Sequence, residues 1–393
     1  MTAGERRASF SLASIFALRM LGLFLVLPVF ALEARRYPGG DDTALVGLAM
    51  GTYGLTQALL QIPLGMASDR WGRKPVILLG LALFALGSGV AAWAPSVQWL
   101  VAGRAIQGAG AISAAVTAFL ADVTRDSVRT KAMALVGIGI ALMFALSLVL
   151  APLLAARIGL RGIFGLTAAL ALAGMAVVAW VVPPEPAQQR DAGRGGLREV
   201  LTHAGLLRLD FGVFALHAVQ LSMWMAVPAV LVRSGLAAAE HWQVYLPAVL
   251  LSFLVMGGVL FRLERKGHLR AVFLFSIALI AAVQLGLLAL GDAPSIWGAA
   301  ALLCLFFTGF NMLEASQPSL VSRLAPAAHR GTALGVYNTL QSLGFFAGGA
   351  VGGWLAKTQG SAGVFGVCAV LSLLWLLLAW PMKAPAVAGP TRH

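Results

Sequence analysis

Two long uncharged stretches, residues 43–68 and 75–103, are separated only by a short charged segment. Each stretch exceeds the roughly 20 apolar residues that a helix needs to cross a bilayer. The whole chain is 60% hydrophobic and 11% charged, whereas soluble domains carry about 25% charged residues. These features predict a helical membrane protein. A membrane β-barrel would need short segments of alternating hydrophobicity, which the sequence lacks.

Hydropathy divides the chain into twelve candidate spans, most of them joined by short turns. They cover residues 9–32, 43–67, 75–94, 97–121, 132–156, 161–182, 207–232, 241–261, 270–290, 295–323, 331–356 and 362–382. We therefore predict an all-α membrane protein with twelve transmembrane helices. Because the number of spans is even, both termini should lie on the same side of the membrane.

The distribution of basic residues predicts which side that is. If the N-terminus is cytoplasmic, 20 Lys and Arg lie on cytoplasmic segments and six lie on outer segments. The outer six are Arg35, Arg36, Arg157, Arg161, Arg233 and Lys357. Basic residues are retained in cytoplasmic loops, so we expect both termini in the cytoplasm. The same rule accounts for the net charge of +13 without a nucleic-acid partner.

A charged segment rich in Pro and Gly, residues 184–205, divides the spans into six and six, as a linker would. We predict an N-terminal six-helix bundle at 1–183 and a C-terminal six-helix bundle at 206–393. The halves echo each other, because D-R-W-G-R-K at 69–74 follows the second span and E-R-K-G at 264–267 follows the eighth. Pseudo-two-fold repeats of this kind are typical of transporters with a substrate site between the halves.

Two segments resemble signatures of the major facilitator superfamily, and a third departs from one. Residues 65–74 fit G-x-x-x-D-R-x-G-R-K, the superfamily's signature in the loop between spans 2 and 3. Residues 104–111 (R-A-I-Q-G-A-G-A) are similar to the R-x-x-Q-G-x-G-A signature of proton-coupled members. Residues 151–156 (A-P-L-L-A-A) differ from the antiporter signature G-P-x-x-G-G, since alanines replace the glycines. The resemblance implies the major facilitator fold and a secondary transporter.

Four further stretches are similar to the YajR-like group of drug:proton antiporter relatives. They are A-L-R-M-L-G at 17–22, T-R-D-S-V-R-T-K-A-M-A at 124–134, N-M-L-E-A at 311–315 and G-T-A-L-G-V-Y at 331–337. The group's namesake carries an extra soluble domain at its C-terminus, and we expect this chain, which stops at His393, to lack that domain. The resemblance implies a bacterial-type inner membrane location.

The charged segment also predicts a conformational latch. Asp69 lies on the expected cytoplasmic side, where the eleventh span begins near Gly331 and Thr332. A helix N-terminus carries about half a positive charge, so a docked Asp69 would hold the two halves together on the inner side and favour the outward-open state. We expect Arg73 to bridge Asp69 to Asp122. The full set of latch residues is Gly65, Asp69, Arg70, Gly72, Arg73, Lys74 and Asp122. In it, glycine would allow close helix contact at 65 and a tight turn at 72. Alternatively, the basic residues only anchor the topology.

Ionisable residues within the spans predict the proton path, because even on a lenient scale a charge at the bilayer centre costs about 2.5–3.5 kcal/mol. Glu314 is the first candidate, since a desolvated carboxylate exchanges its proton near neutral pH, and Pro318 interrupts the helix hydrogen bonding there. His217 titrates in a useful range, and Arg104 matches the basic residue of the proton-coupled signature. The alternatives are a permanent ion pair for Glu314 and a hydrogen-bonded core position for His217.

The expected substrate cavity is apolar and aromatic with scattered polar groups, which suits lipophilic ligands. Its predicted lining is Arg19, Phe24, Gln107, Gln220, Trp224, Asn311, Asn338 and Gln341. Two stripes of small residues, at 344, 348 and 352 and at 137, 141 and 145, should let helices approach closely. They predict moving seams between the halves, ordinary close packing, or both.

The sequence lacks phosphate-binding loops, metal-spaced His and Cys clusters and serine elbows. We therefore predict a protein that is not an enzyme and needs no metal or cofactor. The expected partners are a small-molecule substrate, protons and the lipid bilayer, with no nucleic acid, and the protein should be a monomer. We predict proton-coupled export of small lipophilic compounds by alternating access. The alternatives are uptake by a proton symporter or uniporter, and a non-transporting membrane sensor or assembly protein.

Overall fold

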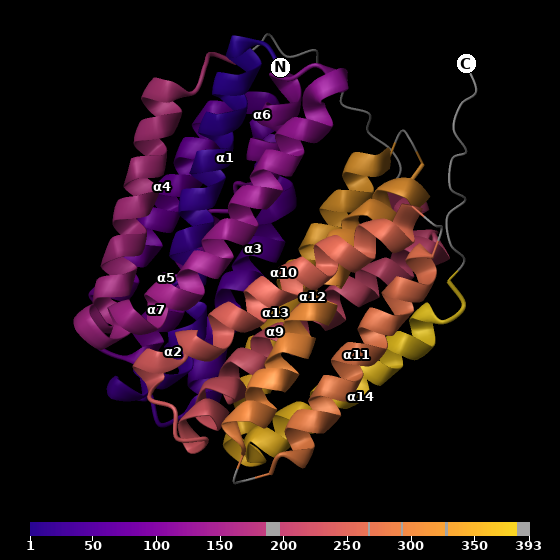
Figure 1. The fold of residues 1–393 in the computed structure, drawn as a ribbon. Helices are drawn as coiled ribbons and strands as arrows, with labels where there is room; N and C mark the ends of the chain where they lie inside the picture. Colours follow the sequence, from indigo (N-terminus) through magenta and orange to yellow (C-terminus); the bar gives the residue numbers. More distant parts are fainter. Residues whose placement is uncertain (186–196, 266–267, 292–293, 327–328, 383–393) are drawn as a thin grey trace.

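The computed structural model describes residues 1–185, 197–265, 268–291, 294–326 and 329–382, and every regular element in these ranges is helical. Figure 1 shows two groups of helices that lean against each other, one from each half of the chain. The predicted all-α fold is confirmed. The side chains of the repeat segment at 264–267 lie outside the described part of the chain.

Two of the predicted spans in the first half are interrupted. The elements are α1 (Ala3–Phe24), α2 (Leu27–Glu33), the 3-10 turn η1 (Ala34–Arg36), α3 (Thr43–Trp71), α4 (Arg73–Ala92), α5 (Val97–Ala109), α6 (Ser113–Asp122), α7 (Asp126–Ala176) and the π-helical turn η2 (Val177–Val181). The first span breaks at residues 25–26, beside Pro28 in the first turn of α2, and the fourth breaks at 110–112. The long α7 holds both the fifth and the sixth spans, which turn back at Gly159 with φ +62°, a conformation that glycine adopts without strain.

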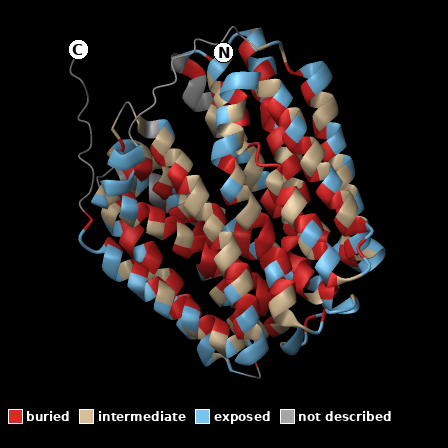
Figure 2. Ribbon diagram, turned by 180° about the vertical axis from the view of Figure 1, so that it is seen from behind, coloured by how far each residue is buried: buried red, intermediate tan, exposed pale blue. Residues whose placement is uncertain are grey.

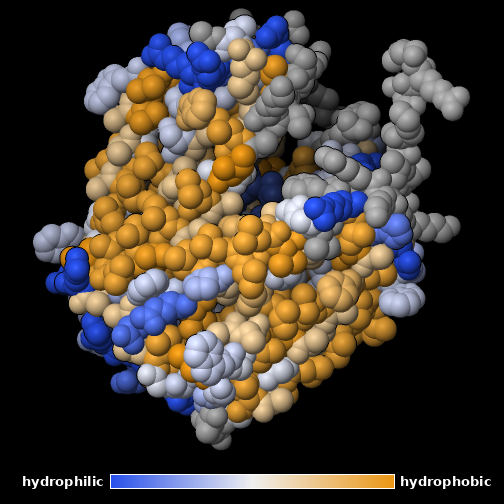
Figure 3. Space-filling model, in the orientation of Figure 1, coloured by the Kyte–Doolittle hydropathy of each residue, from blue (hydrophilic) through white to orange (hydrophobic). Residues whose placement is uncertain are grey.

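The second half follows the predicted spans more simply. Its elements are α8 (Leu197–Thr202), α9 (Ala204–Arg233), the 3-10 turn η3 (Ala238–Glu240), α10 (Trp242–Arg265), α11 (Leu269–Ala289), α12 (Ile296–Leu324), α13 (Arg330–Thr358) and α14 (Gly360–Ala379). In the described residues, ten helical stretches are long and apolar enough to cross a membrane. One of them, 135–181, doubles back at Gly159, and α13 supplies the remaining predicted span. Figure 3 shows the matching hydrophobic surface across the middle of the face that it draws.

The two halves meet along α3 and α13, where backbone packs against backbone. A Cβ atom added at Gly47 would lie 2.2 Å from the Gly349 carbonyl oxygen, and one added at Gly51 would lie 2.6 Å from that of Phe346. Real Cβ atoms do not approach other atoms so closely, so these positions require glycine. Figure 2 shows the buried residues concentrated where the two groups of helices meet.

The end of this seam farthest from residues 65–74 is closed by polar contacts, and we call it the opposite end. Thr43 Oγ1 donates a hydrogen bond to the Gly353 carbonyl at 3.2 Å, and Lys357 Nζ pairs with Asp42 Oδ2 at 2.8 Å. The ammonium of Lys357 holds the pKa of the Asp42 carboxyl below its usual value. Backbone packing, a hydrogen bond and an ion pair therefore all join the halves here.

The other end, where residues 65–74 lie, is open, and we call it the signature end. Leu59 and Trp71 of α3 are exposed, and Cβ atoms added at Gly331 and Gly335 of α13 would meet no neighbouring atom within 4 Å. Figure 1 shows the helices of the two halves diverging toward this end, and Figure 3 shows a hollow between them with hydrophilic atoms inside it. With the orientation predicted from the basic residues, this is a cytoplasm-facing conformation.

The small-residue stripe at 344, 348 and 352 packs inside the second half rather than between the halves. A Cβ atom added at Gly344 would lie 2.4 Å from the carbonyl oxygen of Phe214 in α9. The seam with α3 uses the adjacent face of α13, which carries Gly349 and Gly353. In the second stripe, Gly137 has open space around it. The first stripe therefore serves close packing, and it does not form a seam between the halves in this conformation.

Candidate functional site

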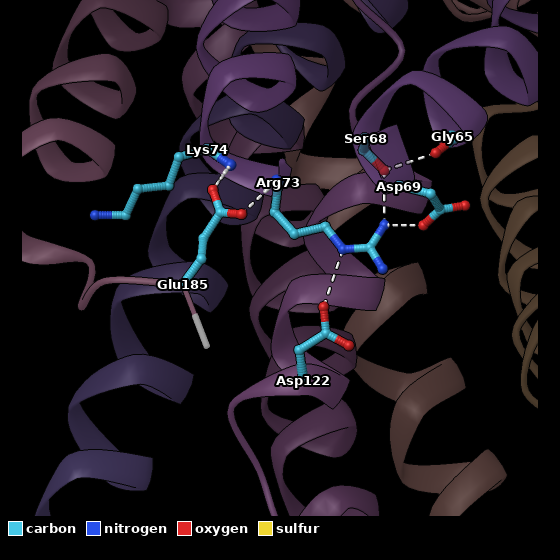
Figure 4. A network of polar contacts seen from close by, with 7 residues as sticks. All are labelled: Gly65, Ser68, Asp69, Arg73, Lys74, Asp122 and Glu185. Atoms are coloured by element: carbon cyan, nitrogen blue, oxygen red, sulfur yellow. Dashed lines mark hydrogen bonds and ion pairs between the residues drawn. The ribbon is translucent and has the colours of Figure 1, made fainter. Parts of the chain in front are cut away.

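Arg73 lies at the centre of a polar cluster at the signature end (Figure 4). Its Nε donates to Asp122 Oδ2 at 2.9 Å, and its Nη1 donates to Ser68 Oγ at 2.8 Å and to the Asp69 carboxylate. The Arg73 side chain is 11% exposed, whereas that of Asp69 is 56% exposed. The guanidinium thus joins the ends of α3 and α6, and one of its two acids faces away from the core of the first half.

Glu185, which the sequence reasoning missed, caps the first turn of α4. Gly72 stands between α3 and α4 with φ +99°, a conformation that favours glycine, and it offers no side chain to cap α4. The two carboxylate oxygens of Glu185 instead accept from the backbone amides of Arg73, at 2.8 Å, and Lys74. Lys74 Nζ donates to the Val182 carbonyl at 2.7 Å. The segment after the sixth span is therefore fastened to the loop between spans 2 and 3.

Two other predicted latch residues, Gly65 and Arg70, lack the close contacts that a latch role predicts for them in this conformation. A Cβ atom added at Gly65 would meet that of Ala114 at 3.5 Å, an ordinary contact, so the expected glycine-dependent packing is not present in this conformation. The Gly65 carbonyl accepts a hydrogen bond from Ser68 Oγ at 2.7 Å. Arg70 is exposed, which suits the alternative that it only anchors the topology.

Asp69 and the start of α13 are apart. Gly331 has no neighbour within 4 Å of an added Cβ, and the α13 N-cap, His329, makes no side-chain capping hydrogen bond. The first amides of α13 are thus without that partner, and one carboxylate of the Arg73 cluster faces outward. Docking of Asp69 on α13 belongs to a conformation that closes this end, and it stays a prediction.

Two buried arginines lie in the first half and share one aromatic ring. Arg19 and Arg104 are each 1% exposed. Arg19 Nη2 donates to the Tyr53 hydroxyl at 2.8 Å, and the Arg104 guanidinium carbon lies 4.7 Å from the centre of the Tyr53 ring. Arg104 also donates to Gln107 Oε1 at 2.9 Å and to the Met50 carbonyl at 3.5 Å. Tyr53 was not among the predicted residues, because only a long-range contact makes it important.

A cavity of about 280 Å³ lies beside Arg104, between the two halves. Phe24, Tyr53 and Arg104 line it from the first half, and Leu221 and Phe345 line it from the second. Its remaining walls are apolar. This cavity best matches the expected substrate site within the described structure. Phe24 is the predicted lining residue that it contains.

The other predicted lining residues fall elsewhere. Gln220 and Trp224 line a second cavity of about 230 Å³ within the second half. Gln107 Nε2 donates to Ser88 Oγ at 2.7 Å inside the first half. Asn311 and Asn338 lie in the second half and line neither cavity. Arg19 does not line the first cavity but donates a hydrogen bond to Tyr53, which does.

His217, Glu314 and Gln341 form a cluster from α9, α12 and α13. His217 is 2% exposed, and its Nδ1 lies 2.9 Å from the Val213 carbonyl oxygen. Since a carbonyl only accepts, we assign the hydrogen to Nδ1, and neutral Nε2 then carries a lone pair. Gln341 Nε2 lies 2.8 Å from His217 Nε2, and Glu314 Oε2 lies 3.3 Å from the same nitrogen.

The contact between His217 and Glu314 is suited to holding one proton. With a neutral imidazole, the Nε2 lone pair accepts from the Gln341 amide, and the ionised Glu314 Oε2 beside it has no hydrogen-bond partner. A proton added to Nε2 would turn the contact with Glu314 into an ion pair, and the Gln341 amide, 3.4 Å from Glu314 Oε1, could then donate to the carboxylate instead. The Glu314 side chain is 41% exposed, but its Oε2, which faces His217, is buried, so the carboxylate is desolvated on one side only in this conformation.

One turn of α13 connects this cluster to the seam and to the cavity. Gln341 belongs to the cluster, and the next residue, Ser342, accepts a hydrogen bond from Gln57 of α3 at 3.1 Å. Phe345 lines the cavity, and its ring centre lies 4.8 Å from that of His217. His217 therefore contacts, through Gln341 and Phe345, the helix that joins the two halves.

Comparisons with known proteins agree with this architecture. The sequence profile described as Major Facilitator Superfamily matches residues 12–349. The chain belongs to the major facilitator superfamily. It is 43% identical to the inner membrane transport protein YajR of Escherichia coli, over 100% of this chain and 87% of the relative. The predicted resemblance to the YajR-like group is confirmed, and the chain is accordingly a transporter rather than an enzyme.

This YajR-like transporter is also similar to more distant proteins over nearly its whole length. The chain is 26% identical to the multidrug resistance protein MdtH of Aeromonas salmonicida over 91% of each chain. Among solved structures, a D-xylose-proton symporter superposes with a TM-score of 0.77 at 15% identity, over 96% of this chain and 98% of that one. At this identity the likeness shows the fold alone.

Proposed function

We propose that this transporter exports small lipophilic compounds in exchange for protons. The observation that carries the proposal is the His217–Glu314 contact at 3.3 Å, which one proton would turn into an ion pair and which lies against α13, the helix at the seam. Moving one charge through 100 mV supplies about 2.3 kcal/mol, so the proton gradient can drive modest export.

In the proposed cycle, the pair takes up a proton while the cavity faces outward, and the substrate leaves. The halves then rock so that the signature end opens. Substrate binding from the cytoplasm expels the proton through the open cleft, where Glu314 is already partly exposed. Arg104, which lies beside the cavity, would interact differently with the site when the substrate is bound and when the proton is bound.

The Arg73 cluster would serve as the latch for the outward-facing state. Asp69 is the exposed acid of that cluster, and the start of α13 lacks a side-chain cap. A carboxylate placed at a helix N-terminus stabilises it by typically 0.3–1 kcal/mol, enough to bias a nearly balanced equilibrium without locking it. Because Arg73 also holds Asp122, protonation of either acid would alter the clasp.

Uptake by proton symport is the second candidate, and the alanines at 155 and 156 favour it, because the antiporter signature has glycines there. The direction of the proton flux separates the two. In inside-out vesicles with an acidic lumen, substrate added to the medium should draw protons out of the lumen by antiport, whereas symport would carry protons with the substrate.

The test measures a pH-quenched dye in such vesicles during addition of a panel of lipophilic cations, neutral drugs and aromatic acids. We expect dye recovery with at least one compound, and no recovery with Glu314→Gln at the wild-type level of folded protein. Glu240→Gln, which makes the same change at an exposed position on η3, is the matched control. Recovery that survives Glu314→Gln would refute the role of Glu314, and a quench instead of a recovery would favour symport.

A further inference from the structure

Arg19 and Arg104 place two buried positive charges within the predicted membrane spans, with no acidic partner in the part of the chain that the structure describes. Among the described residues, neither guanidinium has an acidic oxygen within 4.0 Å, since the ion pairs of the two halves involve other basic residues. Guanidinium groups keep their protons in proteins. The neutral acceptors that they contact, a phenol, an amide and a backbone carbonyl, leave both charges uncompensated.

Both arginines also have donors without acceptors. Arg19 Nε and Nη1 and Arg104 Nε are buried and make no hydrogen bond. Buried polar groups are normally paired, and an exception asks for an explanation such as an absent ligand. Tyr53 contacts both side chains, so the two sets of free donors lie on either side of one residue that itself lines the cavity.

We propose that the transported substrate is a compact lipophilic anion whose charged group binds at Arg104 and Tyr53, with Arg19 contributing from behind the tyrosine. This inference rests on the proposed function only in taking the cavity between the halves as the transported substrate's site. Carboxylate and sulfonate oxygens fit the forked donors of a guanidinium. An anion bound there supplies both the missing charge and the missing acceptors.

The rest of the cavity selects the body of the ligand. Its walls beyond Arg104 and Tyr53 are apolar, with Phe24 on one side and Phe345 on the other. The space between the lining residues, about 280 Å³ including the part open to solvent, favours a compact ligand. An aromatic acid of one or two rings matches these features. A cation would be repelled by both arginines, and a sugar would leave most of its hydroxyl groups without partners.

The cavity also borders the proposed proton site, because Phe345 lines the cavity and packs edge-on against His217. A bound anion would therefore lie on one side of Phe345, with the proposed proton site on the other side.

The experiment measures binding by calorimetry to the purified full chain in nanodiscs of uncharged lipid, with empty nanodiscs as the blank. The probes share one ring system: 2-naphthoate, naphthalene-2-sulfonate, the neutral 2-naphthamide and the cation 2-naphthyltrimethylammonium. We expect saturable binding of the two anions, at least about tenfold weaker binding of the amide, and none of the cation. Arg104→Gln should weaken binding of the anions at least about tenfold without changing that of the amide.

Further variants separate a binding role from a folding role. Arg104→Lys keeps the charge and should bind the anions more tightly than Arg104→Gln does. Arg19→Gln should cause a smaller loss. Arg35→Gln, at an exposed position, should change nothing. Gel filtration and a thermal melt without ligand check that each variant is folded, which we expect because each Gln removes an uncompensated buried charge.

Binding of the amide or the cation as tight as that of the anions would overturn the proposal, and so would the absence of saturable anion binding. These outcomes leave proton exchange untouched, since that is judged by the dye response of Glu314→Gln. Conversely, anion binding that depends on Arg104, together with a proton response that does not depend on Glu314, would uphold the anion site and refute the proposed coupling.

Discussion

A methyl group added at Gly349 should push the transporter away from the conformation described here. In the Gly349→Ala variant, the new Cβ would lie 2.6 Å from the carbonyl oxygen of Gly47 and 2.6 Å from the amide nitrogen of Gly51. Both are backbone atoms of α3, which cannot rotate away as a side chain can. Helices α3 and α13 must therefore separate at the opposite end.

The expected magnitude follows from the cost of overpacking, which is typically about 1–3 kcal/mol for an added methylene. That cost applies only while the opposite end is closed. The gain in helix propensity from Gly to Ala applies in both conformations and cancels. Because 1.4 kcal/mol is a factor of ten, the ratio of molecules that are open at the opposite end to molecules that are closed there should rise roughly 5- to 150-fold.

The assay is the distance distribution between two spin labels at the opposite end. Gln98 and Ala362 are exposed there, one on each half, and the two native cysteines, Cys304 and Cys368, can be replaced by serine beforehand. We expect a second, longer distance to gain population in Gly349→Ala. Gly366→Ala is the matched control, because a Cβ at this glycine of α14 meets nothing within 4 Å.

A distribution for Gly349→Ala identical to that of Gly366→Ala would refute the reasoning. It would mean that the α3–α13 seam absorbs the methyl group by local adjustment, and that the glycine contacts do not control the closed state. A loss of folded protein confined to Gly349→Ala would instead indicate that the cytoplasm-facing state is the only stable one.

Two other residues give sharper tests of individual contacts. Glu185→Ala removes both acceptors from the first turn of α4 and should lower the free energy of unfolding by about 1–2 kcal/mol. Glu185→Gln keeps one acceptor and should lower it less. Thermal melting of the purified proteins measures the difference, and equal melting temperatures for wild type and both variants would count against the cap. Lys357 lowers the pKa of Asp42, so their ion pair stabilises the closed opposite end above about pH 4, the ordinary Asp value, and that contribution is lost as the pH falls through the lowered pKa. The spin-label distances should accordingly widen in acid for wild type, and Asp42→Asn, which keeps a capping oxygen on α3, should abolish that part of the pH dependence; an unchanged acid response in the variant would rule the pair out.

The span pattern was predictable because it depends on composition averaged over about 20 residues, the length of helix that the thickness of a bilayer requires. Breaks within spans were harder to predict from the sequence, because the interruptions at 25–26 and 110–112 depend on local packing as well as on proline and glycine. The turn at Gly159 was expected as a boundary between spans 5 and 6, and the structure joins the two through a single glycine conformation.

The candidate site was predictable only in part. His217, Glu314 and Arg104 stand out because charged or titratable groups are costly within a membrane. Tyr53 and Glu185 do not stand out, because their importance arises from contacts with residues far away in sequence. The face of α13 that meets α3, with Gly349 and Gly353, was not singled out for a similar reason: it lies one residue from the stripe at 344, 348 and 352, and only the contacts of the partner helices tell the two apart.

The two ends of the seam differ in how they can be tuned. At the opposite end, the glycines of α3 and α13 place backbone against backbone, so these positions have no side chain to vary, and almost any substitution at them acts in one direction. At the signature end, side chains hold the parts, and single changes can strengthen or weaken them by small steps. Natural variation and engineering should therefore adjust the balance of conformations through substitutions at the signature end. The glycine contacts between α3 and α13 limit how closely the halves approach at the opposite end, and this limit stays the same in all such variants.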